Sequence, residues 1–81
     1  MKSRVQQGID VIPGVSGGDP CIAGTRIAVW TLEQARRLGA SDAELLRSYR
    51  QLSAEDLVNA RAYVRAHRDQ IDAQIRDNET S

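Results

Sequence analysis

The chain has no phenylalanine, only three aromatic residues and a single cysteine in 81 residues. One thiol cannot build an internal disulfide framework, and Cys21 with the single histidine, His67, falls short of the four ligands of a closed zinc site. The longest apolar run, residues 27–30, is far shorter than the roughly 20 residues of a membrane-spanning helix. The first residues lack a secretory-signal pattern, so we expect a cytoplasmic protein with no membrane partner.

The chain also lacks an excess of either charge, because 11 basic and 11 acidic residues give a net charge of zero. This balance argues against a generally cationic nucleic-acid-binding protein, although it permits a local basic face. All basic residues except Lys2 are arginines, whose planar guanidinium pairs bidentately with carboxylate and phosphate groups. Residues 57–68 contain three arginines and no acid, whereas residues 69–81 contain four acids and one arginine.

Length and composition predict one small domain with a thin core. We place this domain at residues 9–77, between a flexible N-terminus at residues 1–8 and a frayed tail at residues 78–81. Small domains often gain stability from a partner subunit, and open strand edges invite pairing with a second chain. We therefore expect a homodimer, in which Ile71 and Ile75 offer a second apolar contact.

The first half of the chain concentrates glycine and proline and predicts a small β-element. Residues 9–12 and 22–23 are short, β-branched segments of the kind that form strands. A turn rich in glycine and proline separates them at residues 13–20, and Gly24-Thr25-Arg26 forms a second tight turn before residues 27–29. This pattern is typical of an irregular hairpin.

From Trp30 onward, helical spacing predicts three helices. The first, over residues 31–38, has Leu32, Ala35 and Leu38 as its apolar stripe, and Gly39 ends it. Capping-box patterns at Ser41 and Ser53 open a short second helix and a long third helix over residues 54–77. The long helix has an apolar stripe of Leu57, Ala60, Val64, His67, Ile71 and Ile75. The fold class is mostly α within α+β, with the N-terminal β-element followed by a three-helix helix-turn-helix domain.

The sequence offers little for catalysis. Cys21 and His67 could form a thiolate–imidazole pair, but nothing supplies the third, orienting group. Cys21 between Pro20 and Ile22 is better explained as a small buried apolar residue. The glycine-rich residues 14–18 lack the Gly-Lys-Ser/Thr ending of a phosphate-binding loop, and no acid, His or Cys cluster has metal-ligand spacing. We expect a protein that is not an enzyme and holds no metal or cofactor.

Arg61, Arg65 and Arg68 form the first candidate binding surface. Their spacing places them within about 60° of one another around a helix, beside the apolar stripe. They can bind the anionic groups of DNA or of an acidic partner. Alternatively, they form a solvated flank with helical pairs Arg65–Asp69 and Arg68–Asp72, whose orientation contributes only tenths of a kcal/mol.

The short connection between the second and third helices gives the second candidate surface. In a helix-turn-helix, residues at the start of the second motif helix meet base edges, and Asn59 could bind adenine bidentately. Arg47 and Arg50 flank the turn and suit phosphate contacts. The same spacing also occurs in three-helix packing that binds no DNA.

Two segments resemble a known family. The run at residues 13–29, with its Gly24-Thr25-Arg26-Ile27 core, and the later run at residues 39–49 are similar to the bacterial family called domain of unknown function 433. The resemblance covers about residues 9–70 and implies a small winged or homeodomain-like helix-turn-helix protein. It marks Gly24, Thr25 and Arg26 as the family motif, which can be functional or only a structural turn. It identifies no catalytic residue.

The resemblance also implies a role. Many members of this family are treated as VapB-like antitoxins encoded beside a PIN-like ribonuclease toxin. The expected function is therefore an antitoxin that binds and neutralises such a toxin and binds its own promoter DNA as a dimer. The alternative is a stand-alone helix-turn-helix DNA-binding regulator without a toxin. In the first case Arg47, Arg50 and Asn59 would contact DNA, and Arg61, Arg65 and Arg68 would contact the toxin.

Overall fold

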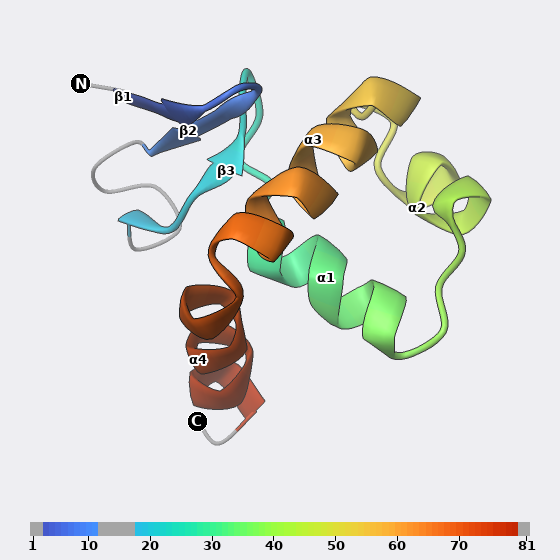
Figure 1. Cartoon of the computed structure of the whole chain (residues 1–81). Helices are drawn as coiled ribbons and strands as arrows, with labels where there is room; N and C mark the ends of the chain where they lie inside the picture. The colour runs from blue at the N-terminus through green and yellow to red at the C-terminus, as the bar shows by residue number, and fades with distance from the viewer. Residues whose placement is uncertain (1–2, 12–17, 80–81) are drawn as a thin grey trace.

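A small antiparallel sheet lies beside a group of helices in the computed structural model, which describes residues 3–11 and 18–79 (Figure 1). The described elements are β1 (Ser3–Gln6), β2 (Ile9–Val11), β3 (Cys21–Ile22), α1 (Val29–Arg37), α2 (Asp42–Ser48), α3 (Ala54–Ala66) and α4 (Arg68–Glu79). Helix α3 is central, because it contacts α1, α2, α4 and strand β2. The predicted mostly helical α+β class is confirmed.

The sheet has the order β1-β2-β3. Ile9 lies opposite Ile22, and Asp10 opposite Cys21, so the two predicted strand segments pair as expected. Strand β1 was not expected, since residues 1–8 were taken as a flexible N-terminus; in the structure it pairs with β2. Gly8 permits this return because its φ of +74° closes the turn between the two strands. Of the turn expected at residues 13–20, residues 13–17 lie outside the described part of the chain.

Helix α1 begins and ends close to its predicted bounds. Gly39 has a φ of +107°, and Ala40 donates its backbone N–H to the carbonyl of Ala35 at 3.0 Å, as expected where a glycine ends a helix. Leu32 is buried, but Leu38 is 81% exposed. The expectation of a three-residue stripe was wrong at Leu38, because the helix ends there and its last turn lies at the edge of the fold.

Both predicted capping boxes are present. The Ser41 hydroxyl accepts from the Glu44 backbone N–H at 3.2 Å, and the Glu44 carboxylate accepts from the Ser41 N–H at 3.2 Å. Ser53 and Asp56 make the same reciprocal pair, at 3.2 and 2.9 Å. These contacts satisfy backbone donors that have no partner inside the helix, and they fix where α2 and α3 begin.

The single long helix predicted over residues 54–77 was wrong. At His67 the backbone leaves helical geometry, with φ −133° and ψ 42°, and α4 begins at the next residue. The change of direction brings Ile71 and Ile75 into the core, where both are buried and α4 packs against α1 and α3. A straight helix would have carried both side chains beyond the domain. They therefore are not the exposed dimer contact that we expected.

The break also changes the roles of two rings. His67 is exposed rather than part of the apolar stripe, and its ring stacks on Tyr63 with centroids 4.2 Å apart. Tyr63 is buried and donates its hydroxyl hydrogen to Gln70 across the break at 2.8 Å. With four helices in the described residues, the three-helix helix-turn-helix arrangement is not confirmed. Residues 78–79, expected in the frayed tail, belong to α4, and residues 80–81 lie outside the described part.

Candidate partner-binding site

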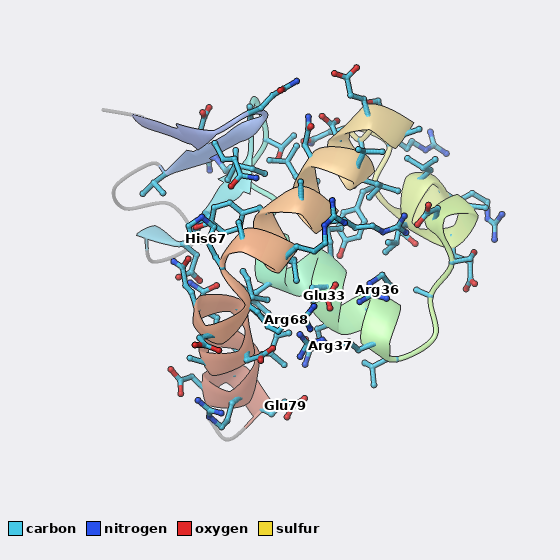
Figure 2. The ribbon with its side chains drawn as sticks, viewed as in Figure 1. Glu33, Arg36, Arg37, His67, Arg68 and Glu79 are labelled. Carbon is cyan, nitrogen blue, oxygen red and sulfur yellow. The ribbon has the colours of Figure 1, made fainter. Side chains whose placement is uncertain are left out.

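A shallow depression of about 240 Å³ lies where α1, α3 and α4 meet, and arginines surround it. Its lining residues are Glu33 and Arg36 from α1, Arg61, Val64 and Arg65 from α3, and Arg68 from α4. Figure 2 shows Glu33, Arg36 and Arg68 near one another in this region. The three arginines predicted as one stripe thus remain together although the helix breaks between Arg65 and Arg68. We call this feature the arginine depression.

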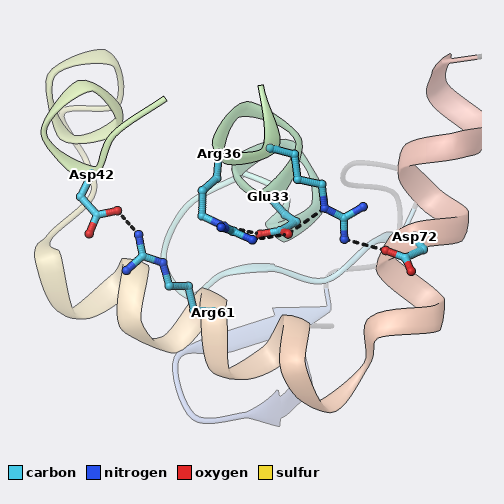
Figure 3. A network of polar contacts seen from close by, with 6 residues as sticks. Glu33, Arg36, Asp42, Arg61 and Asp72 are labelled. Carbon is cyan, nitrogen blue, oxygen red and sulfur yellow. Dashed lines mark hydrogen bonds and ion pairs between the residues drawn. The ribbon is translucent and has the colours of Figure 1, made fainter. Parts of the chain in front are cut away.

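Sequence reasoning missed Glu33 and Arg36, because they come from α1, more than 20 residues earlier in the chain. Glu33 is only 4% exposed. Arg36 donates two hydrogen bonds to its carboxylate, at 2.9 and 2.8 Å, and Arg37 donates a third at 2.8 Å (Figure 3). The i, i+3 and i, i+4 spacing of these residues was the available signal. The spacing alone does not show that Glu33 is buried, and its burial is what makes these hydrogen bonds important.

The electrostatics of Glu33 follow from this arrangement. Burial by itself raises the pKa of the Glu33 carboxyl, because it penalises the charged form. The hydrogen bonds and charges of Arg36 and Arg37 outweigh burial and hold the pKa of Glu33 below its ordinary value. Glu33 is therefore a firmly ionised group that fixes both guanidinium groups beside the depression.

The helical pair Arg68–Asp72 is not formed. Asp72 instead accepts a 2.6 Å hydrogen bond from Arg37, which joins α4 to α1 (Figure 3). Arg61 pairs with Asp42 at the start of α2. In the part of the chain that the structure describes, neither Arg65 nor Arg68 forms an ion pair. Within the described residues, two arginines of the depression thus have an acidic partner, Arg36 and Arg61, and two have none, Arg65 and Arg68.

The residues of the second candidate surface come from the end of α2, the turn after it and the middle of α3. Arg47, in the last turn of α2, and Arg50, just after it, are both exposed. Asn59 is half-buried, and its amide lies so close to Gly8 that a Cβ added there would be 2.4 Å from Nδ2. The amide of Asn59 therefore faces the turn between β1 and β2. Arg47 and Arg50 are the more exposed residues of this surface.

The family motif forms a turn. Gly24 has a φ of +80°, and the Thr25 hydroxyl donates to the carbonyl of Ile22 at 2.9 Å while accepting from the Ile27 N–H at 3.0 Å. The geometry of the turn therefore explains why a glycine stands at position 24 and a threonine at position 25. Arg26 is exposed and lines an open cavity of about 410 Å³ together with the half-buried rings of Trp30 and Tyr49.

Cys21 and His67 lie in different environments, and they do not form the pair considered above. Cys21 is fully buried and its thiol donates to the carbonyl of Asp19 at 3.3 Å, whereas His67 is exposed on Tyr63. Across residues 3–11 and 18–79, no three His, Cys, Asp or Glu side chains gather as metal ligands would. In the same residues, no helix combines the length and apolar character needed to cross a bilayer.

Comparisons with known proteins give a consistent result. A family model described as "Protein of unknown function (DUF433)" matches residues 9–64. The chain is also similar to the crystal structure of a DUF433 member protein from Anabaena variabilis, with 48% sequence identity and a TM-score of 0.82. That match covers 86% of this chain and 69% of the other. No curated protein matches the sequence, and neither match names an activity.

Proposed function

The chain belongs to the DUF433 family, and from this premise we propose that it is the antitoxin of a bacterial type II toxin–antitoxin pair. In this role it binds and neutralises a PIN-like ribonuclease, as the VapB-like antitoxins of the family are thought to do. The protein is a binding module, and the arginine depression is its toxin contact.

The observation that carries the proposal is the gathering of arginines from three helices around one hollow. A PIN-like ribonuclease has an acidic active site that binds metal. Arg61, Arg65 and Arg68 complement such a site, because arginine pairs bidentately with carboxylates. A guanidinium inserted among those carboxylates also competes electrostatically with the catalytic metal ion. Binding and inhibition would then follow from one contact.

Promoter binding would use Arg47 and Arg50, which lie outside the arginine depression. Arg47 and Arg50 are exposed at the end of α2 and in the following turn, so both can reach phosphates. Asn59 contributes no base contact in this arrangement, since its amide lies against Gly8. With a net charge of zero, the chain binds DNA weakly and with strong salt dependence, so promoter occupancy benefits from the complex.

We also propose that the chain forms a homodimer through strand β1. On its outer side, β3 is already bonded, because Ile22 donates its N–H to the carbonyl of Ile27 at 3.0 Å. Among the described strands, β1 pairs only with β2, so its second edge has no partner strand within the described residues. An open edge presents backbone groups to a second copy. A monomer mass by light scattering at tens of micromolar would contradict this contact.

The test of the proposed function is a search beside the gene for a reading frame that encodes a PIN-like ribonuclease, followed by co-expression of the two proteins. The wild-type chain should restore growth and inhibit ribonuclease activity in the purified complex. Arg65→Glu with Arg68→Glu should abolish neutralisation and leave promoter binding intact, whereas Arg47→Glu with Arg50→Glu should do the reverse. Promoter binding without any toxin partner would instead support the stand-alone regulator.

A further inference from the structure

We infer that the arginine depression is a receptor for carboxylate side chains of an acidic protein segment, with Arg65 and Arg68 as the binding pair. This inference deepens the proposed function, which supplies the toxin as the natural source of the segment. It adds two elements that the stripe of arginines did not contain. Arg36 is a guanidinium held in place by Glu33, and Asp42 is an internal competitor that occupies Arg61.

The first step of the argument is the chemistry already present in the depression. The depression already contains one bound carboxylate, because Arg36 donates a hydrogen bond to each carboxylate oxygen of Glu33. A guanidinium has five N–H donors, and Arg36 uses two of them on Glu33, so it keeps donors for a second anion. Because Glu33 is buried and ionised, Arg36 loses little side-chain freedom when a ligand arrives.

The second step is that Arg65 and Arg68 form no ion pair within the described residues. Helical spacing would pair Arg68 with Asp72, but Arg37 binds that carboxylate. The break at His67 turns α4 so that Arg68 borders the same hollow as Arg65. Two guanidinium groups that have no ion pair within residues 3–11 and 18–79 lie beside one concavity, which favours bidentate binding of incoming carboxylates.

The third step distinguishes a protein carboxylate from nucleic acid. The depression is about 240 Å³, a size that accepts one or two side chains. Glu33 lines the depression and Asp42 pairs with Arg61, so the arginines do not form the continuous field of positive charge that favours a phosphate backbone. Carboxylates on an otherwise mixed protein surface meet the arginines without requiring a field of positive charge.

The fourth step is the exchange at Arg61. Its ion pair with Asp42 is exposed, with the two side chains 41% and 48% accessible, and such pairs contribute little to stability. A partner carboxylate can therefore replace Asp42 on Arg61. Removing the Asp42 charge should release a third arginine and strengthen binding, an effect that loss of folding cannot produce.

The experiment uses the full chain and a hexaglutamate peptide, with arginine Nε–Hε signals followed by NMR. The peptide should shift the signals of Arg65 and Arg68 most. Arg65→Gln and Arg68→Gln should each weaken binding about fivefold, and Asp42→Asn should strengthen it about threefold. The matched control is Arg76→Gln, which removes the same charge from an exposed position on the same helix and should change binding less than twofold.

The inference is overturned if all arginine variants weaken peptide binding equally, or if Asp42→Asn does not strengthen it. It is also overturned if a DNA duplex of equal charge shifts Arg65 and Arg68 more than the peptide does. A parallel titration with the PIN-like protein separates the two proposals. Peptide binding without toxin binding keeps the carboxylate receptor and rejects the antitoxin role. Toxin binding that is insensitive to Arg65→Gln and Arg68→Gln rejects the receptor and keeps the antitoxin.

Discussion

Two sides of helix α3 differ sharply in how they are packed. On one side, Asn59 presses against Gly8, where not even a Cβ would fit without a shift. On the other side, Arg61 and Arg65 border an open depression. The backbone of α3 is regular along its whole length, so the difference in packing comes from the elements that lie beside it. Where the sheet packs against the helix, the contacts with Gly8 contribute to stability, and where α3 meets α1 and α4, its arginines border an open depression.

The largest effect is expected on the packed side, at Gly8. Gly8→Ala should lower the free energy of unfolding by about 3 kcal/mol, because it adds a clash with Asn59 to a backbone of positive φ. Adding Asn59→Ala should recover about 1 kcal/mol, since it removes the clash and leaves the backbone strain. Urea unfolding of the two variants measures both quantities. Full stability of Gly8→Ala would show that this side is not tightly packed.

The next effect is expected at the floor of the depression. Glu33→Gln should cost about 2 kcal/mol at neutral pH, because it weakens the hydrogen bonds from Arg36 and Arg37. The folded-state pKa of Glu33 is lowered, so its stabilisation is complete above the ordinary glutamate pKa of about 4.3. That stabilisation is lost as the pH falls through the lowered folded value.

Chemical unfolding of wild type and Glu33→Gln between pH 7 and pH 2 checks the sign. The stability difference between the two chains should shrink as the solution becomes acidic. Glu55→Gln, at an exposed position in the first turn of α3, serves as the control and should change stability by less than about 0.5 kcal/mol. A difference that stays constant with pH would mean that the charge of Glu33 is not what stabilises the fold.

A smaller effect is expected at the start of α3, which both sides share. Ser53→Ala should cost about 1 kcal/mol, because the Asp56 backbone N–H loses its acceptor. Ser48→Ala, at an exposed position in the last turn of α2, should stay within about 0.5 kcal/mol. Equal melting temperatures for Ser53→Ala and wild type would contradict the assigned beginning of the helix.

The smallest effect is expected on the open side. Arg65→Gln combined with Arg68→Gln should change the free energy of unfolding by less than about 0.5 kcal/mol, since both side chains are exposed and form no ion pair in the described structure. Thermal unfolding followed by circular dichroism is sufficient. A loss comparable to that of Glu33→Gln would show that these arginines support the fold and are not kept for binding.

Local signals in the sequence predicted much of the fold. The capping residues Ser41 and Ser53 fixed the beginnings of α2 and α3, and Gly39 fixed the end of α1, because each acts through hydrogen bonds or dihedral angles within a few residues. The paired strand segments followed from their β-branched composition. The common side of Arg61 and Arg65 followed from helical spacing.

Contacts between distant residues decided the rest. Nothing local at residues 66–68 marks a helix end, since glycine and proline are absent there; α3 stops because Ile71 and Ile75 gain burial against the core when the chain turns. The same turn places Asp72 beside Arg37, and in the described part of the chain Arg68 forms no ion pair. The sequence by itself therefore determined the helix caps at Ser41, Ser53 and Gly39 and the pairing of β2 with β3, but not strand β1 or the division between α3 and α4. Only the tertiary structure decided which arginines are engaged, because an ion pair depends on where a second helix places its acid.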